Sequence, residues 1–265
     1  MTATTGGAQA TARTDWEHID CPVCDGTRFE HLFDKDDEPF VRCSGCGLVL
    51  INPRPPFTTI RAGYDAAYSA GYTRKADKKL ARARRRVARV RRHQGHGGGR
   101  RGGTPRRWLD VGCSAGFVVK AAADAGYEAH GVDIETDGIA WGRERLGLAN
   151  LREGLLDEQA YPAASFDVIS LYDVIEHVPD LNAFVAELAR LLAPAGVIDL
   201  GTPDLGHWRV PRPLERWEEL KPSEHLYYFD RTTLARLLAR HGLVVERVRF
   251  ALKPGLKVLV RHAAR

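Results

Sequence analysis

A glycine-rich turn between an apolar segment and an alanine-rich segment constrains this chain more than any other feature. Residues 107–111 favour a buried strand, the pattern Asp-x-Gly-x-Ser-x-Gly occupies residues 110–116, and residues 117–125 favour a helix. Glycines at a strand-to-helix turn let the backbone approach a ligand closely, while the amides of the helix face that ligand. The segment therefore predicts an α/β domain with a ligand site at this turn.

A second predicted strand, residues 126–133, ends in the acidic residue Asp133. Such an acid, about 20 residues beyond the turn, can accept hydrogen bonds from both hydroxyls of a ribose. The GxGxxG spacing of dinucleotide-dependent dehydrogenases is absent, which disfavours that class of enzyme. We therefore expect a different cofactor that carries a nucleoside.

Residues 106–265 resemble the class I S-adenosylmethionine-dependent methyltransferases. The family's first motif is similar to LDVGCSAG at residues 109–116, and its second strand ends in an acid such as Asp133. Residues 164–178 resemble its fourth strand and the turn that follows, and residues 187–200 resemble its next helix and fifth strand. The resemblance implies a Rossmann-like α/β fold with a seven-stranded, mainly parallel sheet, in which the last strand is antiparallel.

The same resemblance implies a set of cofactor contacts. The glycine-rich turn would hold the methionine portion, Asp133 would bind the ribose with Ile134 against the adenine, and residues 155–157 would reach the adenine edge. The loop after the fourth strand would line the sulfonium side. The implied cofactor-binding residues are Asp110, Gly112, Ser114, Gly116, Asp133, Ile134, Asp157 and Tyr172.

Candidates for acid–base chemistry follow the fourth predicted strand. The run Asp173-Val-Ile-Glu-His177 resembles the one that supports acceptor binding, and in some members a divalent metal, in ubiquinone-type O-methyltransferases. Asp173 and His177 are therefore candidate catalytic residues, and Mg²⁺ is a candidate metal. His225 is a second candidate base, because the family often places a histidine there. The alternative is that the acid–His pair only orders the loop.

The segment from residue 203 to residue 231 should lie at the carboxyl edge of the sheet, where such folds bind ligands. Aromatic rings with interleaved cations suit a small-molecule acceptor that is part ring and part anion. A surface lid is the alternative. The side chains concerned are His207, Trp208, Arg209, Arg212, Arg216, Trp217, Lys221, His225, Tyr227 and Tyr228.

Four of the five cysteines form two CxxC pairs, Cys21 with Cys24 and Cys43 with Cys46. Four thiolates at this spacing predict a tetrahedral Zn²⁺ site, and closure by four protein ligands indicates a structural metal. Residues 29–41 between the pairs favour a short hairpin. The two cysteine pairs and the hairpin together predict a small zinc ribbon. A module of this size cannot build its own core, so the metal must stabilise it. We expect the ribbon beside the entrance to the acceptor site.

The basic residues are concentrated in one place. Fifteen of the 39 Lys and Arg residues, but only one of the 34 acidic residues, lie between Arg74 and Arg107. Residues 74–92 predict a helix with one apolar stripe. The other faces of this helix are basic and could bind nucleic acid or anionic lipid, or could simply be solvated. Tyr64, Tyr68 and Tyr72 share a face of a preceding helical stretch, either packed on the catalytic domain or acting as a lid.

These observations predict a disordered leader at residues 1–14, a zinc ribbon at 15–56, a linker with two helices at 57–105 and a methyltransferase domain at 106–265. No apolar stretch is long enough to span a bilayer, and the first residues do not resemble a signal peptide, so we expect a cytoplasmic protein.

The favoured function is S-adenosylmethionine-dependent O-methylation of a sugar, nucleotide-linked or aromatic metabolite in a bacterial biosynthetic pathway. One alternative is an RNA methyltransferase that binds nucleic acid through the ribbon and the basic helix. Another is a non-catalytic zinc-ribbon binding protein.

Overall fold

The computed structural model describes residues 15–62, 75–95, 100–101, 104–222 and 224–264. Its main sheet has seven strands, as the resemblance implied, and their order is β12-β13-β10-β9-β6-β7-β8. In chain order these are β6 (Arg107–Val111), β7 (Glu128–Asp133), β8 (Leu151–Glu153), β9 (Phe166–Tyr172), β10 (Leu192–Thr202), β12 (Leu243–Arg249) and β13 (Leu256–His262).

The strand order reverses between β6 and β9. The chain proceeds from β6 through β7 to β8 on one side, then returns to pair β9 with the other edge of β6, in parallel. Strand β13 pairs antiparallel with both β10 and β12, which confirms the expected antiparallel last strand. In parallel sheets, ligands bind outside the carboxyl ends of the strands at such a reversal.

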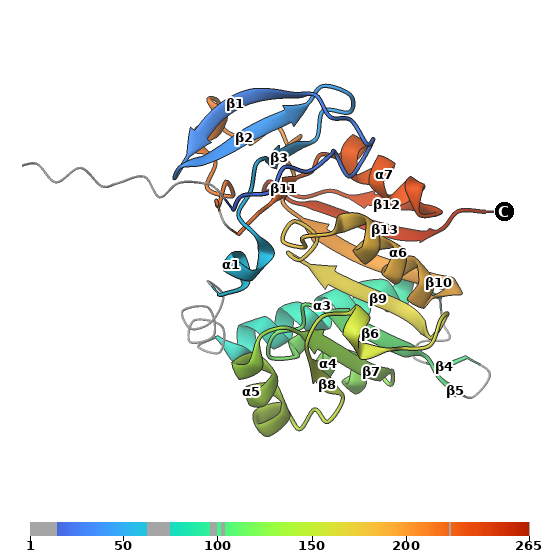
Figure 1. The fold of residues 1–265 in the computed structure, drawn as a ribbon. Coiled ribbons are helices and arrows are strands. Elements are labelled where there is room, and N and C mark those ends of the chain that lie inside the picture. The colour runs from blue at the N-terminus through green and yellow to red at the C-terminus, as the bar shows by residue number, and fades with distance from the viewer. Residues whose placement is uncertain (1–14, 63–74, 96–99, 102–103, 223, 265) are drawn as a thin grey trace, which may run out of the picture.

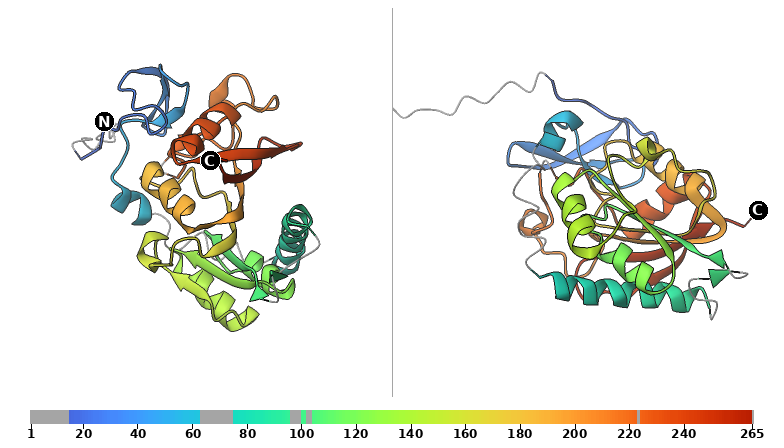
Figure 2. Two further views of the ribbon diagram at one scale, coloured as in Figure 1. Left: turned by 90° about the vertical axis from the view of Figure 1, so that its right-hand side faces the viewer. Right: turned by 90° about the horizontal axis from the view of Figure 1, so that it is seen from below.

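Helices cover both faces of the sheet (Figures 1 and 2). Neighbouring residues of a strand point to opposite faces, so Trp108 packs with the helices of one face and Leu109 with those of the other. On the Trp108 face lie α3 (Ala76–His93), α4 (Phe117–Asp124) and α5 (Thr136–Leu146), and on the Leu109 face lie α6 (Leu181–Leu191) and α7 (Arg231–Arg240).

Helix α3 begins and ends close to the predicted positions, and its apolar stripe explains its location. Ala83, Val87 and Val90 are buried and belong to the same hydrophobic cluster as α4. Tyr64, Tyr68 and Tyr72 lie outside the described residues, as does most of the glycine-rich segment after α3. Among the described residues, no helix is long and apolar enough to cross a membrane.

The N-terminal segment forms a second, four-stranded sheet at one end of the main sheet (Figure 1). Strands β1 (Phe29–Lys35) and β2 (Glu38–Cys43) form the expected hairpin, and β3 (Val49–Ile51) pairs with β2. The fourth strand, β11 (Tyr227–Tyr228), comes from the larger domain and pairs antiparallel with β3. The ribbon therefore shares its sheet with the segment that leads into α7.

The ribbon also shares the hydrophobic core of the larger domain. Cys21, Val41 and Leu50 belong to the same buried cluster as residues of α6 and α7. This arrangement agrees with the expectation that the ribbon cannot build a core of its own. The other short elements are α1 (Phe57–Ala62), β4 (Arg100–Arg101), β5 (Thr104–Pro105) and two 3₁₀ turns, Asp157–Gln159 and Leu214–Arg216.

Arg54 joins the ribbon to the larger domain. Its side chain is 5% exposed and donates to the hydroxyl of Tyr227 at 2.5 Å and to the carbonyl of Pro179 at 2.9 Å. Its Nε donates to Glu17 at 2.7 Å. A buried guanidinium requires such partners, so one side chain connects the first described residues, the strand β11 and the loop before α6.

We predict that Arg54→Ala lowers the free energy of unfolding by about 2–3 kcal/mol, because it removes three hydrogen bonds to a charged donor. Urea denaturation followed by circular dichroism measures the change. Arg236→Ala, at an exposed position of α7, is the matched control and should change stability by less than about 0.5 kcal/mol. An equally small effect at Arg54 would contradict its role as a joining residue.

Candidate functional site

Two glycines of the turn between β6 and α4 have backbone conformations that L side chains rarely adopt. φ is 68° at Gly112 and 74° at Gly116. A Cβ atom at Gly112 would lie 2.3 Å from Cγ2 of Val174, and one at Gly116 would lie 2.7 Å from Cδ1 of Leu148. Glycine is therefore required at both positions, and the turn lies directly against the loop after β9.

Asp133 at the end of β7 fixes the conformation of the same turn. One carboxylate oxygen accepts from the amide of Ser114 at 2.6 Å, and the other accepts from the amide of Glu135 at 2.9 Å. Burial raises the pKa of Asp133, and these amides act in the opposite direction because they stabilise the carboxylate. The acid thus holds two loops together at the edge of the sheet.

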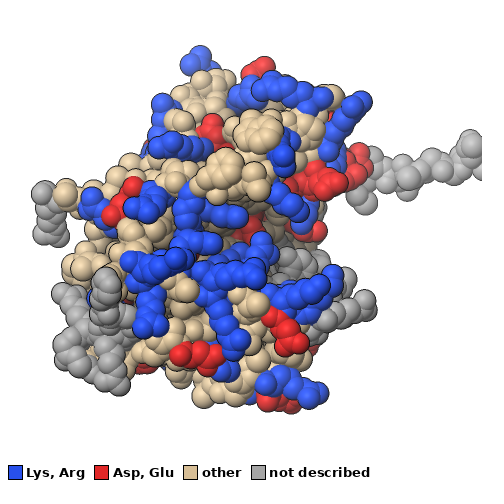
Figure 3. Space-filling model, turned by 180° about the vertical axis from the view of Figure 1, so that it is seen from behind, with Lys and Arg blue, Asp and Glu red and all other residues tan. Residues whose placement is uncertain are grey.

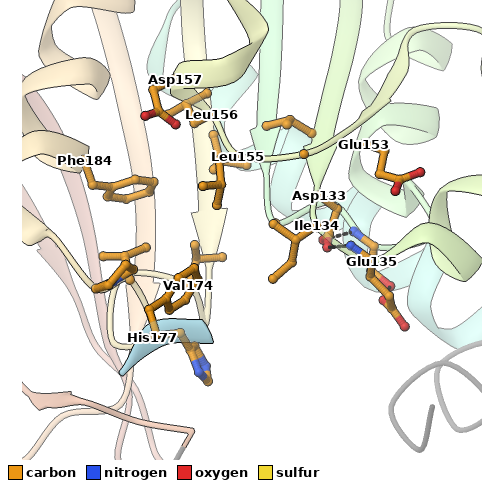
Figure 4. Close-up of a pocket in the computed structure, with 18 of the residues that line it drawn as sticks. Asp133, Ile134, Glu135, Glu153, Leu155, Leu156, Asp157, Val174, His177 and Phe184 are labelled. Atoms are coloured by element: carbon orange, nitrogen blue, oxygen red, sulfur yellow. Dashed lines mark hydrogen bonds between the residues drawn. The ribbon is translucent and has the colours of Figure 1, made fainter. Parts of the chain in front are cut away.

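A cavity of about 870 Å³ opens at this edge and is large enough for a nucleoside cofactor. Figure 4 shows Asp133, Ile134 and Glu135 on one side of it and Phe184, Val174 and His177 on the other. The predicted site residues that line it are Gly112, Ser114, Asp133, Ile134, Asp157, Tyr172, Asp173 and His177. Apolar residues around them, such as Leu155 and Leu156, suit an adenine ring.

Asp110 and Gly116 do not line this cavity. Asp110 is 3% exposed and accepts a hydrogen bond from Ser170 Oγ at 2.5 Å, and Ser170 Oγ accepts one from Trp108 Nε1 at 2.8 Å. Burial raises the pKa of Asp110 to about 7, although the Ser170 hydrogen bond opposes this. Asp110 therefore stabilises the turn indirectly, because its hydrogen bond with Ser170 links β6 to β9 just before the turn.

Phe57 and Thr58 of α1 also line the cavity, although sequence reasoning did not place them there. They follow directly on the proline-rich connector after the ribbon, and no local pattern in that segment indicates a ligand contact. Their position depends on the packing of the ribbon against the catalytic domain. Only the three-dimensional fold could identify them.

A second cavity, of about 470 Å³, adjoins the first. Tyr172, Asp173 and His177 line both cavities, so these three residues mark their junction. Asp173 has a φ of 58°, and its amide donates to the carbonyl of Gly201 at 2.8 Å, which fixes the loop after β9 against the end of β10. Two ligands bound in the two cavities would therefore meet at this loop.

The two candidate bases lie together in the second cavity. The rings of His177 and His225 are in edge-to-face contact with centroids 4.6 Å apart. Nδ1 of His177 bonds the carbonyl of Glu224 at 2.8 Å, and Nδ1 of His225 bonds the carbonyl of Glu219 at 2.9 Å. A carbonyl only accepts, so Nδ1 carries the proton in both rings and Nε2 carries the lone pair of the neutral imidazole.

Burial lowers the pKa of His177 to about 4. The pKa of His225 falls to about 3, because burial acts together with the neighbouring His177 and Lys221. Both rings are consequently neutral at pH 7.

Glu176 also lines the second cavity and lies close to both histidines. It is 1% exposed, and one of its carboxylate oxygens accepts from Thr202 Oγ1 at 3.0 Å. Its Oε1 lies 4.0 Å from Nε2 of His177. Burial, with Asp173 nearby, raises the pKa of Glu176 to about 8, so the carboxyl group is protonated at pH 7.

The segment from residue 203 to residue 231 differs from the expectation. Of its ten named residues, only Lys221 and His225 line the second cavity. Trp217, Tyr227 and Tyr228 are buried instead, and Trp208 is 70% exposed. The prediction of aromatic plates around the acceptor is therefore wrong for these residues, because the core beneath the ribbon uses the buried rings for packing.

The four paired cysteines come together in the ribbon, against the hydrophobic core that it shares with α6 and α7. Their sulfur atoms all lie within 4.8 Å of one another, with 3.4 Å between those of Cys21 and Cys46 and 3.5 Å between those of Cys24 and Cys43. Four Zn–S bonds of about 2.3 Å in a tetrahedron place sulfur atoms about 3.8 Å apart. The cluster therefore fits one zinc ion.

A comparison with known families identifies the catalytic part of the chain. The methyltransferase-domain family matches residues 72–248, which is more than half of the sequence. The chain therefore belongs to this family, and the identification of an S-adenosylmethionine-dependent methyltransferase is confirmed.

Similar proteins agree with this assignment. A probable S-adenosylmethionine-dependent methyltransferase of Mycolicibacterium smegmatis is 33% identical over 138 residues, which cover 52% of each chain, so the match spans about half of that relative. The ubiquinone biosynthesis O-methyltransferase of Rhodopseudomonas palustris is 27% identical over 57% of this chain and 68% of its own length.

A solved structure confirms the fold. Magnesium protoporphyrin IX methyltransferase from Synechocystis, crystallised with bound S-adenosylhomocysteine, superimposes with a TM-score of 0.58 at 17% identity. The superposition covers 78% of this chain and 100% of that one.

We predict that Asp133→Asn weakens the binding of S-adenosylhomocysteine at least about tenfold, because it removes the charged acceptor available to the ribose hydroxyls. Isothermal titration calorimetry measures the affinity. Glu144→Gln removes one acid from an exposed position of α5 and should leave the affinity unchanged. Equal affinities of wild type and Asp133→Asn would show that the cofactor does not contact this carboxylate.

Proposed function

We propose that this protein transfers the methyl group of S-adenosylmethionine to an oxygen atom of a small molecule bound in the second cavity. The observation that carries the proposal is the junction of the two cavities at Tyr172, Asp173 and His177. Methyl transfer from a sulfonium is an in-line displacement, and holding the two reactants in adjoining cavities supplies much of its rate. A sugar, a nucleotide-linked metabolite or an aromatic hydroxyl compound would suit this arrangement.

An oxygen acceptor requires a base, because its hydroxyl proton must leave as the methyl group arrives. The Nε2 atoms of His177 and His225 are suited to this task, since their Nδ1 atoms are held by backbone carbonyls. The protonated Glu176 lies near His177 and adds no negative charge at neutral pH. We assign proton removal to this pair of histidines.

The cluster of Glu176, His177 and His225 does not fit Mg²⁺ well. Their ligand atoms lie within 4.8 Å of one another, but two of the three are imidazole nitrogens. Mg²⁺ prefers oxygen ligands in octahedral geometry. The donor set therefore supports proton transfer by histidine, and we assign no step to Mg²⁺.

The two alternative functions receive less support. Residues expected to contact the cofactor line one continuous cavity, which disfavours a non-catalytic binding protein. Four arginines of α3 line the second cavity together with the candidate bases His177 and His225, which favours a role in binding the methyl acceptor over a separate grip on RNA. Both observations favour catalysis on a small molecule.

A test of the proposal measures release of S-adenosylhomocysteine with a panel of sugar, nucleotide-linked and aromatic hydroxyl compounds. With the acceptor so found, His177→Gln and His225→Gln should each lower kcat about 100-fold, as expected for the loss of a general base. Binding of S-adenosylhomocysteine should remain unchanged in both variants. His31→Gln, at an exposed position of the ribbon hairpin, serves as the control.

The pH profile gives a second readout in the same experiment. Because burial lowers both histidine pKa values to about 4 and about 3, the bases remain neutral as the pH falls and are lost only as it passes through those values. Wild-type kcat/KM should therefore stay constant down to about pH 5. Methylation of amines but not of hydroxyl compounds, or full activity of both variants, would contradict the proposal.

We also propose that the four ribbon cysteines bind one structural Zn²⁺, on the basis of their number and sulfur spacing. The ion would fix the position of the ribbon hairpin and would not take part in methyl transfer, because four protein thiolates leave no open position.

We predict one zinc ion per chain by inductively coupled plasma mass spectrometry. Cys46→Ser should lose the metal and lower the midpoint of thermal unfolding, since metal binding contributes to folding in such small modules. Cys113→Ser alters the fifth cysteine, which lies in the glycine-rich turn, and should retain the metal. A wild-type protein that contains no zinc, and whose midpoint of thermal unfolding equals that of Cys46→Ser, would contradict the assignment.

A further inference from the structure

Helix α3 has two different faces. Its apolar stripe packs toward α4, whereas each of Arg82, Arg85, Arg86 and Arg89 lies three residues from one of the others and four residues from another. This spacing places them on one side of a helix, and all four line the second cavity. The arginine side of α3 is therefore a wall of the proposed acceptor site.

Three further cations reach the same cavity from other parts of the chain. They are Lys221 from the segment before β11, Arg249 from the end of β12 and Lys257 from β13. Figure 3 shows Lys and Arg side chains gathered across the middle of the face that α3 covers. Seven cations from four separate segments thus converge on one cavity.

Most of this positive charge is not neutralised by the protein. Two of the seven cations are paired, Arg249 with Asp199 and Lys221 with Glu224 at 3.8 Å. The guanidinium of Arg86 stacks on the ring of Tyr172 at 3.6 Å. Arg82, Arg85 and Arg89 form no ion pair with any described residue.

Lys257 shows the resulting repulsion. Its pKa is lowered by burial and then by the neighbouring positive charges of Arg82, Arg86, Arg89 and Arg249. A site that holds unpaired cations at close quarters is arranged for an anion.

The acidic residues of the cavity do not offset this charge. Asp173, Glu176 and Glu219 are the acids that line it. Burial raises the pKa values of Asp173 and Glu176, in the second case to about 8, so Glu176 contributes no charge at pH 7. The cavity therefore remains strongly positive on the side of α3.

We propose that this arginine wall binds a phosphate or diphosphate group of the methyl acceptor. The proposed function enters this inference at one point, in identifying the bound molecule as the methyl acceptor. Guanidinium groups bind phosphate oxygens with paired hydrogen bonds, for which their planar fork is suited. A single carboxylate would occupy only a small part of this wall. Arg86 and Tyr172 connect the wall to the junction with the cofactor cavity.

An anion held at the wall would orient the rest of the acceptor toward His177 and His225. Binding energy from such a remote group can be used to position the reacting atom. A cavity of about 470 Å³ accommodates a molecule of metabolite size. These dimensions favour a small phosphorylated molecule over the backbone of an RNA strand.

The test is a calorimetric titration with inorganic pyrophosphate at about 0.15 M ionic strength, where charges outside the cavity are screened, with and without S-adenosylhomocysteine. The variant Arg82→Gln/Arg85→Gln/Arg89→Gln should weaken pyrophosphate binding at least about tenfold, because charge-assisted hydrogen bonds are lost. The matched control, Lys78→Gln/Arg91→Gln/Arg92→Gln, removes the same charge from exposed positions of α3 outside the cavity. It should change the affinity less than about twofold.

Equal losses in the two triple variants, or no pyrophosphate binding by the wild type, would overturn the proposal. A 12-nucleotide RNA without terminal phosphate provides the second arm. Its binding should weaken equally in both variants, and a loss confined to the cavity variant would assign the wall to nucleic acid instead. Failure of S-adenosylhomocysteine to bind would count against the proposed function. The affinity for pyrophosphate measured without S-adenosylhomocysteine tests the anion site separately.

Discussion

The reversal of strand order between β6 and β9 is the constraint on which the rest of this structure depends. It brings two loops distant in sequence to one edge of the sheet, the glycine-rich turn after β6 and the loop after β9. Their contact is so close that Gly112 has no room for a side chain beside Val174. One loop contributes to the cofactor cavity, and the other supplies the three residues shared with the second cavity.

The ribbon and the catalytic domain are less separable than their sequences indicate. Strand β11 completes the ribbon sheet, and Leu226 beside it accepts from the amide of Ile51 and donates to the carbonyl of Glu176. Arg54 adds a second, buried connection through Tyr227 and Pro179. The segment that carries His225 thus lies between the ribbon and the loop that carries His177.

Sequence reasoning succeeded where the information was local. The glycine-rich turn, the acid that ends β7 and the paired cysteines are contiguous patterns whose chemistry requires a particular neighbour or backbone conformation. It was less successful where long-range packing decides the outcome. Trp217 and Tyr228 could face a ligand or a core, and only the pairing of β11 with the ribbon decides between them. The helix α3 was expected from its apolar stripe, and its basic faces were expected to bind nucleic acid or anionic lipid or to be solvated; that four of its arginines line a cavity beside the candidate bases was not predicted.

The position of Leu226 has a consequence for how this protein responds to its surroundings. The same residue hydrogen-bonds Ile51 of the ribbon on one side and, on the other, the carbonyl of Glu176, the residue before His177. The folding of the cysteine-bearing ribbon and the alignment of His225 consequently belong to one cooperative unit. Any condition that oxidises the thiols of the ribbon would therefore lower the fraction of molecules in which His177 and His225 lie together, although no described residue of the ribbon lines the second cavity.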